Sequence, residues 1–318
     1  MSTLKSPESA DRPPLALIAG PTASGKSDCA IRLALALRRQ GKDAVVINAD
    51  SAQVYRDLAA LSARPSEAEM QGVEHRLFGE WDGAETCSAA DWAKRAREIV
   101  ADLHARSAIP ILVGGTGLYL RTLLDGIAPI PPIDPAVRAA VRAMSVAAAH
   151  QALQAEDPRR AAMLAPADTA RVARALEVVR STGRSMLDWQ HDRVGGIGAV
   201  VALHARLLLP PRDWLYTRCD QRFAHMLAGG ALDEVTRLLD RKLDPTLPVM
   251  RAIGVPELAA LLAGSITHAE AEARGAQATR NYAKRQYTWF RNQPPRDWAR
   301  LEAKDVDITD AFASLLRI

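Results

Sequence analysis

The stretch LALIAGPTASGKSDCA, residues 15–30, decides the fold. Its centre, residues 20–27, reads G-x-x-x-x-G-K-S and follows an apolar run over residues 15–19. Apolar residues spaced three and four apart follow it, namely Ala30, Leu33, Ala34 and Leu37. A strand, a glycine-containing loop and a helix in this order are typical of a phosphate-binding loop. The backbone N–H groups of such a loop and the positive end of the helix both favour an anion.

The side chains of this loop indicate which ligand it takes. Lys26 can reach a terminal phosphate, and the Ser27 hydroxyl suits Mg²⁺. The sequence therefore predicts a di- or triphosphate and magnesium, but it does not establish that a phosphoryl group is transferred. The residues expected to bind the phosphates are Gly20, Pro21, Thr22, Ala23, Ser24, Gly25, Lys26 and Ser27.

Four apolar runs predict buried strands, over residues 15–19, 44–47, 109–113 and 200–209. Amphipathic helical stretches separate the first three, which favours an α/β fold with a parallel sheet and helices on both faces. After the last strand we expect helix to the end of the chain. In such sheets the ligand lies beyond the carboxyl ends of the strands, so the residues there are the candidates for the site.

Asp50 follows the second strand, in the stretch AVVINAD. A carboxylate there could orient magnesium-bound water or accept a proton from a nucleophile. The alternative is a turn or helix-capping aspartate before Ser51. After the third strand, residues 114–117 read GGTG, and Thr116 offers a hydroxyl at the same edge.

Two joints divide the chain. The first is the Pro-rich segment DGIAPIPPIDP, residues 125–135, and the second is VGGIG, residues 194–198. They predict a helical insertion over residues 131–198 within a core formed by residues 14–130 and 199–318. The polar, Pro-rich residues 1–13 lack the apolar core of a secretory signal and predict a loose tail.

Composition bounds the protein class. With 48% hydrophobic and 25% charged residues, the 318-residue chain is typical of a soluble globular protein without a membrane span. Three scattered cysteines favour the reducing cytoplasm and argue against a zinc site or a disulfide framework. The net charge of +4 says little about partners.

The local distribution of charge says more. Residues 273–296 contain six basic and no acidic residues, with four aromatic residues interleaved. Arg280, Lys284, Tyr287 and Arg291 are spaced four, three and four apart, which places them on one helical face. Such a face can follow phosphates while aromatic rings stack on unpaired bases. The alternative is a solvated basic face, with Trp289 and Phe290 in the core.

Several motifs together resemble the tRNA dimethylallyltransferases. They are GPTASGKS, NADSAQVYRDL, VGGTGLYLRTLLDG, ARVARALEVVRSTGRS and ATRNYAKRQYTWFRNQ, and they cover residues 15–291 in unbroken order. The resemblance implies a P-loop NTPase-like fold and transfer of a dimethylallyl group from dimethylallyl diphosphate to N6 of the adenine 3′ of the anticodon. It implies tRNA as partner, Mg²⁺ as cofactor and a cytoplasmic enzyme, which we expect to be a monomer.

The resemblance also implies roles for single residues. Asp50 matches the general base, and Lys26 and Arg222 match basic groups at the diphosphate. The matches for tRNA contact are Asp50, Ser51, Ala52, Gln53, Thr116, Arg138, Ala170, Arg171, Val172, Ala173 and Arg174, to which the basic helix adds Arg280, Lys284 and Arg285.

The chain departs from the family pattern at several positions. Ala170 replaces a glutamine, Val255-Pro256 replaces Tyr-Arg or Tyr-Lys, and Arg76 replaces a histidine. The segment LSARP, residues 61–65, replaces Gly-Thr-Ala-Lys-Pro. These changes concern tRNA contacts more than the reaction.

Two other function classes fit parts of the sequence. A small-molecule kinase with a P-loop core and a helical lid would bind ATP, and Asp50 would then deprotonate a hydroxyl. A nucleotide-gated RNA-binding protein would use the same loop without chemistry. Labelled dimethylallyl diphosphate with tRNA, or labelled ATP, separates the three.

Overall fold

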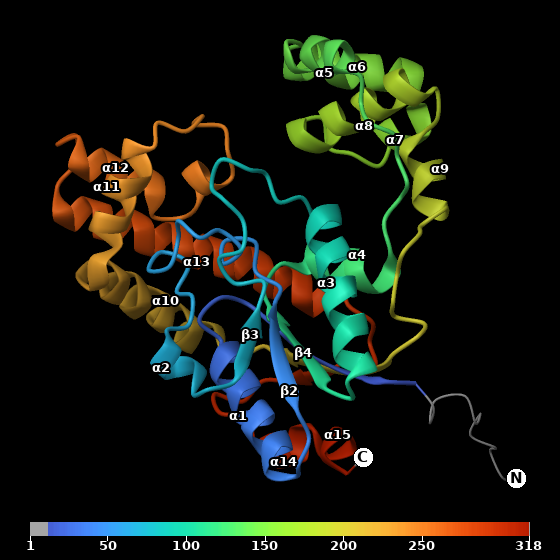
Figure 1. Cartoon of the computed structure of the whole chain (residues 1–318). Coiled ribbons are helices and arrows are strands. Elements are labelled where there is room, and N and C mark those ends of the chain that lie inside the picture. Colours follow the sequence, from blue (N-terminus) through green and yellow to red (C-terminus); the bar gives the residue numbers. More distant parts are fainter. Residues whose placement is uncertain (1–11, 318) are drawn as a thin grey trace, which may run out of the picture. The chain divides into compact units, whose positions relative to one another are not determined.

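The structure is a computed structural model that describes residues 12–317. These residues form two compact units (Figure 1). The first contains the chain up to Thr122 and again from Gly198, and the second is Leu123–Ile197. All but the last two residues of the predicted N-terminal tail lie outside the described part of the chain.

A six-stranded sheet with the order β3-β2-β4-β1-β5-β6 forms the centre of the first unit. All of its strand pairs are parallel. The predicted α/β class with a parallel sheet is therefore confirmed. The strands are β1 (Pro14–Ala19), β2 (Ala44–Asn48), β3 (Glu74–Arg76), β4 (Ile109–Gly114), β5 (Ala202–Leu208) and β6 (Ala299–Leu301).

The central strands are buried on both faces, which is why they are continuous apolar runs rather than alternating ones. Ile18, Val46 and Ile111 pack on one face against the apolar side of α1 (Lys26–Arg39). Since successive side chains alternate, Leu17 and Ile47 point to the other face, and both are fully buried. Each fully buried side chain of this kind contributes about 1.5–3 kcal/mol to folding.

The other helices of the first unit differ in position: α3 (Ala89–Ala105) packs on β4, whereas α11 (Leu232–Asp240) and α12 (Val255–Leu262) pack on each other, away from the sheet (Figure 1). Two of them, α10 and α13, pack along each other and matter most for the site. The remaining elements include a π-helical turn (Leu227–Ala231) and a 3₁₀ turn (Val249–Arg251). The α-helices are α2 (Glu67–Met70), α3 (Ala89–Ala105), α4 (Gly117–Asp125), α10 (Arg212–Met226), α11 (Leu232–Asp240), α12 (Val255–Leu262), α13 (His268–Asn292), α14 (Ile308–Ala311) and α15 (Ala313–Leu316).

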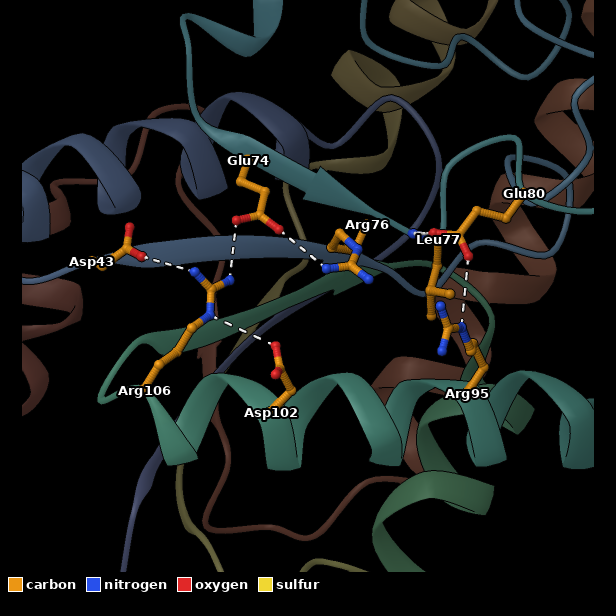
Figure 2. Close-up of polar contacts among 8 residues, drawn as sticks. All are labelled: Asp43, Glu74, Arg76, Leu77, Glu80, Arg95, Asp102 and Arg106. Atoms are coloured by element: carbon orange, nitrogen blue, oxygen red, sulfur yellow. Dashed lines mark hydrogen bonds and ion pairs between the residues drawn. The ribbon is translucent and has the colours of Figure 1, made fainter.

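Polar side chains surround the edge strand β3 (Figure 2). The sequence did not predict this strand. The Arg106 guanidinium lies 3.1 Å from the Glu74 carboxylate of β3 and 3.4 Å from the Asp43 carboxylate before β2. Glu80 accepts the Leu77 N–H at 2.7 Å and lies 3.9 Å from Arg95 of α3. Exposed ion pairs contribute only about 0–1 kcal/mol each, so pairing with β2 does most to hold this strand.

The expectation of helix from residue 209 to the end is wrong at β6. This three-residue strand pairs with β5, and the Leu209 N–H donates to the Leu301 carbonyl at 2.8 Å. Its half-buried side chains give no apolar run, so its position depends on a neighbour distant in the sequence.

The second unit is a small helical lobe with its own apolar core. The core contains Val141, Leu153, Leu164, Val172 and Leu176. Its helices are α5 (Pro135–Arg142), α6 (Val146–Glu156), α7 (Pro158–Ala161), α8 (Thr169–Thr182) and α9 (Met186–His191).

The two ends of the lobe run side by side. Ile127 and Val194 form an antiparallel bridge. Gly126 has φ +84°, and a Cβ there would lie 2.5 Å from the Val194 carbonyl oxygen. The glycine in this joint therefore permits close backbone packing. None of the helices between residues 12 and 317 combines the length and apolar character needed to cross a bilayer.

Candidate active site

The loop predicted to bind phosphate, residues 20–27, lies between the end of β1 and the first turn of α1. Lys26 begins α1, and its Nζ donates to the Pro21 carbonyl at 2.6 Å, across the loop. The Ser24 hydroxyl is buried, and no residue of the described chain accepts or donates a hydrogen bond to it. A buried polar atom without a partner is costly, and a phosphate oxygen would supply one.

A cavity of about 320 Å³ opens beside this loop in the first unit. Thr22 of the loop, Asp50, and Arg222 of α10 lie on its wall. Leu58, Leu61, Phe223, Met226 and Ile253 give the cavity an apolar side. One cavity therefore combines a residue of the predicted phosphate-binding loop, a carboxylate and apolar surface.

Asp50 is held in a fixed orientation. The Asn48 Oδ1 accepts the Asp50 N–H at 2.8 Å, and the Asn48 Nδ2 donates to the carbonyls of Asp50 and Leu77, both at 3.0 Å. The Asp50 Oδ1 accepts the Ala52 N–H at 3.0 Å. This turn aims the carboxylate at the cavity, as a proton acceptor requires.

Thr116 connects the loops that follow β2 and β4. Its Oγ1 accepts the Ser51 N–H at 2.9 Å and donates to the Ser51 hydroxyl at 3.2 Å. The predicted tRNA contact at Thr116 thus has a structural role in the protein itself. Ser51 and Ala52 line the cavity, whereas Gln53 is buried and donates to the Ser62 and Ala63 carbonyls.

Two cations accompany Asp50. Burial lowers the pKa of Lys26 from its usual value to about 8, the Asp50 carboxylate opposes this shift, and the Arg222 guanidinium adds to it. Burial also lowers the pKa of Arg222, against the attraction of Asp50. Both groups are therefore desolvated cations that an anion would stabilise.

Helix α10 contributes a further basic residue, Arg218, which the sequence motifs did not predict. The Arg218 Nε donates to the Ala23 carbonyl of the phosphate loop at 2.9 Å. Arg218 precedes Arg222 by four residues, one helical turn, so this spacing could have identified it.

A carboxylate outside the cavity fixes the segment on its apolar side. Glu234 is buried and accepts the N–H groups of Ala59, Ala60 and Leu61 at 2.5, 2.9 and 2.9 Å. The Ser62 carbonyl in the same segment accepts the Arg222 Nη2 at 3.3 Å. The unusual LSARP segment is thus well anchored and places Leu61 on the cavity wall.

Helix α13 closes another side of the cavity. Tyr282 and Arg285 line it, and the Arg285 guanidinium lies 5.7 Å from the Tyr282 ring centroid. Burial and the Asp50 charge raise the pKa of Tyr282, so its hydroxyl stays neutral. In the sequence, Tyr282 is one of the four aromatic residues interleaved with the basic residues of this helix.

The predicted basic face of α13 is only partly free. Lys284 and Arg291 are exposed, but Arg280 forms an ion pair with Asp220 of α10. The Tyr287 hydroxyl donates to the Leu209 carbonyl at 3.3 Å, and its ring packs beside Ala23 and Leu215. Phe290 is fully buried, as the alternative interpretation expected, whereas Trp289 is only half-buried.

In the lobe, three arginines surround the buried carboxylate of Glu177. The Arg142, Arg174 and Arg138 guanidinium groups lie 3.2, 3.8 and 4.0 Å from it. One carboxylate among three arginines leaves a positive surface, which suits RNA phosphates.

The other lobe residues implied by the resemblance differ in exposure. Ala170 and Arg171 are exposed, and Arg171 pairs with Asp168 at 3.0 Å. Val172 is 1% exposed and Ala173 packs against the lobe core, so a tRNA contact of Val172 could only involve its backbone.

The residues at the phosphate loop fit a magnesium ion bound mainly through its ligand. Ser27 is exposed at the first turn of α1. No group of three metal-ligating side chains occurs among residues 12–317. Mg²⁺ commonly binds through one or two protein oxygens together with phosphates and water, and Ser27 beside a diphosphate meets that pattern.

Comparisons with known proteins agree with this geometry. The IPP transferase family model matches residues 53–293. The chain is 65% identical over 307 residues to a tRNA dimethylallyltransferase from Erythrobacter litoralis, covering 96% of this chain and 97% of the relative.

Solved structures show the same similarity. The chain resembles the full-length tRNA isopentenylpyrophosphate transferase from Bacillus halodurans with a TM-score of 0.67 and 32% identity, covering 96% of this chain and 95% of that one. It also resembles a eukaryotic dimethylallyltransferase acting on tRNA, with a TM-score of 0.74 and 27% identity over 86% of this chain and 69% of that one.

Proposed function

This chain belongs to the IPP transferase family, and from that premise we propose that it transfers the dimethylallyl group of dimethylallyl diphosphate to N6 of the adenine 3′ of the tRNA anticodon. The chain is a transferase that modifies tRNA, so the kinase alternative is set aside. We further propose that it acts as a monomer in the cytoplasm. One observation supports the donor most strongly, the single cavity shared by Thr22, Asp50 and Arg222.

The phosphate loop would hold the diphosphate as a leaving group rather than as a group to be transferred. An allylic carbon ionises readily because its cation is resonance-stabilised, so the main task is to stabilise the departing anion. Backbone N–H groups of the loop, Lys26 and Arg222 supply positive charge where that anion develops, usually the largest catalytic effect. When bound at Ser27, Mg²⁺ would supply further positive charge to the diphosphate.

Asp50 would then complete the transfer. The bond from the prenyl C1 to the diphosphate oxygen breaks with its electron pair, and the adenine N6 forms a bond to C1. The surplus proton on N6 passes to the Asp50 carboxylate. Placing N6 in line can contribute roughly 7–11 kcal/mol in well-oriented cases, so the fixed orientation of Asp50 also favours the reaction.

The acceptor base must leave the anticodon-loop stack to reach this cavity. Tyr282 and Arg285 offer a flat surface on α13 for an unstacked base. Once donor and base fill the cavity, its apolar residues would help to exclude water, which would otherwise trap the cation.

Product analysis tests the proposal. Unmodified tRNA incubated with the protein and dimethylallyl diphosphate should yield N6-dimethylallyladenosine after digestion to nucleosides. The same tRNA with ATP in place of the prenyl donor should show no new nucleoside. A chain that leaves the tRNA unchanged with the prenyl donor would contradict the proposal.

Neutralising Arg171 and Arg174 together should weaken tRNA binding while donor affinity stays unchanged. Each lost phosphate contact should flatten the slope of log affinity against log salt by about 0.7–0.9. Filter binding of tRNA over a salt series measures the slope. Arg159→Gln is the matched control, since Arg159 lies on the same lobe and pairs with Asp188 at 3.4 Å. Equal slopes for the control and the double variant would mean that Arg171 and Arg174 do not contact RNA phosphates.

Donor binding should weaken as the pH rises through about 8, because Lys26 loses its proton in the free protein near that value. Below this pH the lysine is charged, so its contribution to donor affinity should be constant. Above it, affinity should fall by at most about tenfold per pH unit, since the bound diphosphate raises the pKa of Lys26. Calorimetry with a non-reactive thio analogue of the donor measures this profile. Lys26→Arg should flatten it, and an equally steep profile in that variant would assign the titration to another group.

A further inference from the structure

Gln286 is a polar residue in the buried stripe of α13. That stripe contains Ala276, Thr279, Ala283 and Phe290, and Gln286 itself is only 6% exposed. A buried amide must find hydrogen-bond partners or it destabilises the fold. The hydrogen-bond partners of Gln286 therefore indicate which segments of the chain it positions.

Both ends of the Gln286 amide bind backbone groups at the phosphate site. The Oε1 accepts the Thr22 N–H of the phosphate loop at 2.7 Å. The Nε2 donates to the Gly115 carbonyl, in the loop after β4, at 2.8 Å. One partner is a donor and the other an acceptor, so this pair of contacts requires an amide and a carboxylate could not make both.

At this contact there is no room for a side chain on residue 115. A Cβ on Gly115 would lie 2.2 Å from the Gln286 Nε2 and 3.1 Å from the Gly20 carbonyl oxygen. Any larger residue at position 115 would therefore displace the amide. Three segments distant in the sequence meet at this point, namely the phosphate loop, the loop after β4, and α13.

We propose that Gln286 is a positioning residue for the donor, and that its amide holds Thr22 and the phosphate loop in the geometry that binds diphosphate. The proposal rests on the proposed function. Thr22 lines the cavity with Asp50, so a shift of Thr22 would weaken the contacts that the loop makes with the diphosphate and lower the affinity for the donor. Gln286 itself would touch neither the donor nor the tRNA.

Gln286→Glu tests the proposal with almost no change of shape. The carboxylate can still accept from Thr22 but cannot donate to Gly115, and its charge opposes a nearby diphosphate. We expect the donor KM to rise about tenfold or more, while kcat at saturating donor and the KM for tRNA stay nearly unchanged. Gln293→Leu, at the end of the same helix, is the control and should leave all three constants unaltered.

Gly115→Ala tests the same contact from the other side. Alone it should raise the donor KM about as much as Gln286→Ala does, because the new methyl group displaces the amide. The double variant should be no worse than Gln286→Ala by more than about twofold, since the amide is already gone. Urea unfolding identifies variants that fail to fold, and if Gln286→Ala is one, Gln286→Glu and Gly115→Ala decide the matter.

Three results would overturn the proposal. One is a lower kcat with an unchanged donor KM, which indicates a merely structural role. Another is full additivity of the two substitutions. The third is tighter binding of inorganic diphosphate in Gln286→Ala, which would mean that the amide competes with phosphate for the Thr22 N–H. Failure of the proposed function would look different, because the unaltered chain itself would not prenylate tRNA.

Discussion

Asp50→Ala should lower the single-turnover rate of prenyl transfer by about 10²–10⁴, the usual contribution of a general base. The fold should survive, because Asp50 is only half-buried at the end of β2 and its removal opens no cavity in the core. Binding of tRNA and of the thio donor analogue should change little. Rapid-quench measurement with saturating substrates gives the rate, and urea unfolding gives the stability.

Asp50→Asn separates orientation from proton acceptance. The amide can still accept the Ala52 N–H and hydrogen-bond the adenine amine, but it cannot take the proton. Asp43→Asn is the control, since Asp43 lies at the opposite end of the same strand. Nearly full activity in Asp50→Asn would refute the general-base assignment. Loss of donor binding in Asp50→Ala would instead assign Asp50 to the metal or the diphosphate.

Lys26→Met should lower kcat/KM for the donor by about 10²–10³, the size found when one preorganised charge donor is removed. Burial desolvates this lysine beside Arg222, so the free protein holds two desolvated cations that a bound diphosphate would neutralise. Without Lys26 the diphosphate would lose a positively charged partner, both in the bound donor and as the leaving group. Steady-state kinetics at fixed tRNA measures the loss.

Stability should move the other way in Lys26→Met. The pKa of Lys26 is lowered to about 8, so folding disfavours its charged form at neutral pH, and an apolar side chain of similar length removes that cost. The urea midpoint should therefore stay equal or rise. Lys42→Met, placed after the far end of α1, should change neither activity nor stability. Full activity of the Lys26→Met variant would show that the loop does not hold the leaving group through Lys26.

Local patterns made part of this site predictable. The phosphate loop is encoded within eight consecutive residues, because its geometry depends on glycines and a helix start that are neighbours in sequence. The position of Asp50 near this loop could be predicted because the carboxyl ends of parallel strands meet at one edge of the sheet. The position of Arg222 came from resemblance alone, and the structure places it on the same cavity as Asp50.

Long-range contacts made the rest unpredictable. Strands β3 and β6 are three residues each and form only because a neighbouring strand supplies partners. Tyr287 shares helical spacing with the basic residues of α13, but the packing of α10 and the phosphate loop decides that it is half-buried. For Gln286, one feature of the sequence could have indicated a buried hydrogen bond. This residue falls on the three-and-four spacing of Ala276, Thr279, Ala283 and Phe290, and a polar residue on a buried stripe indicates a specific partner.

The fate of the diphosphate shows whether the loop holds a leaving group or a group that is transferred. Donor carrying one label in the prenyl group and another in the terminal phosphate is mixed with tRNA and excess enzyme for a single turnover. The prenyl label should enter tRNA at the same rate as the phosphate label appears as inorganic diphosphate, with no phosphate label in RNA. Phosphate label in the RNA, or its release as monophosphate at the rate of the reaction, would contradict the claim that this loop holds a leaving group.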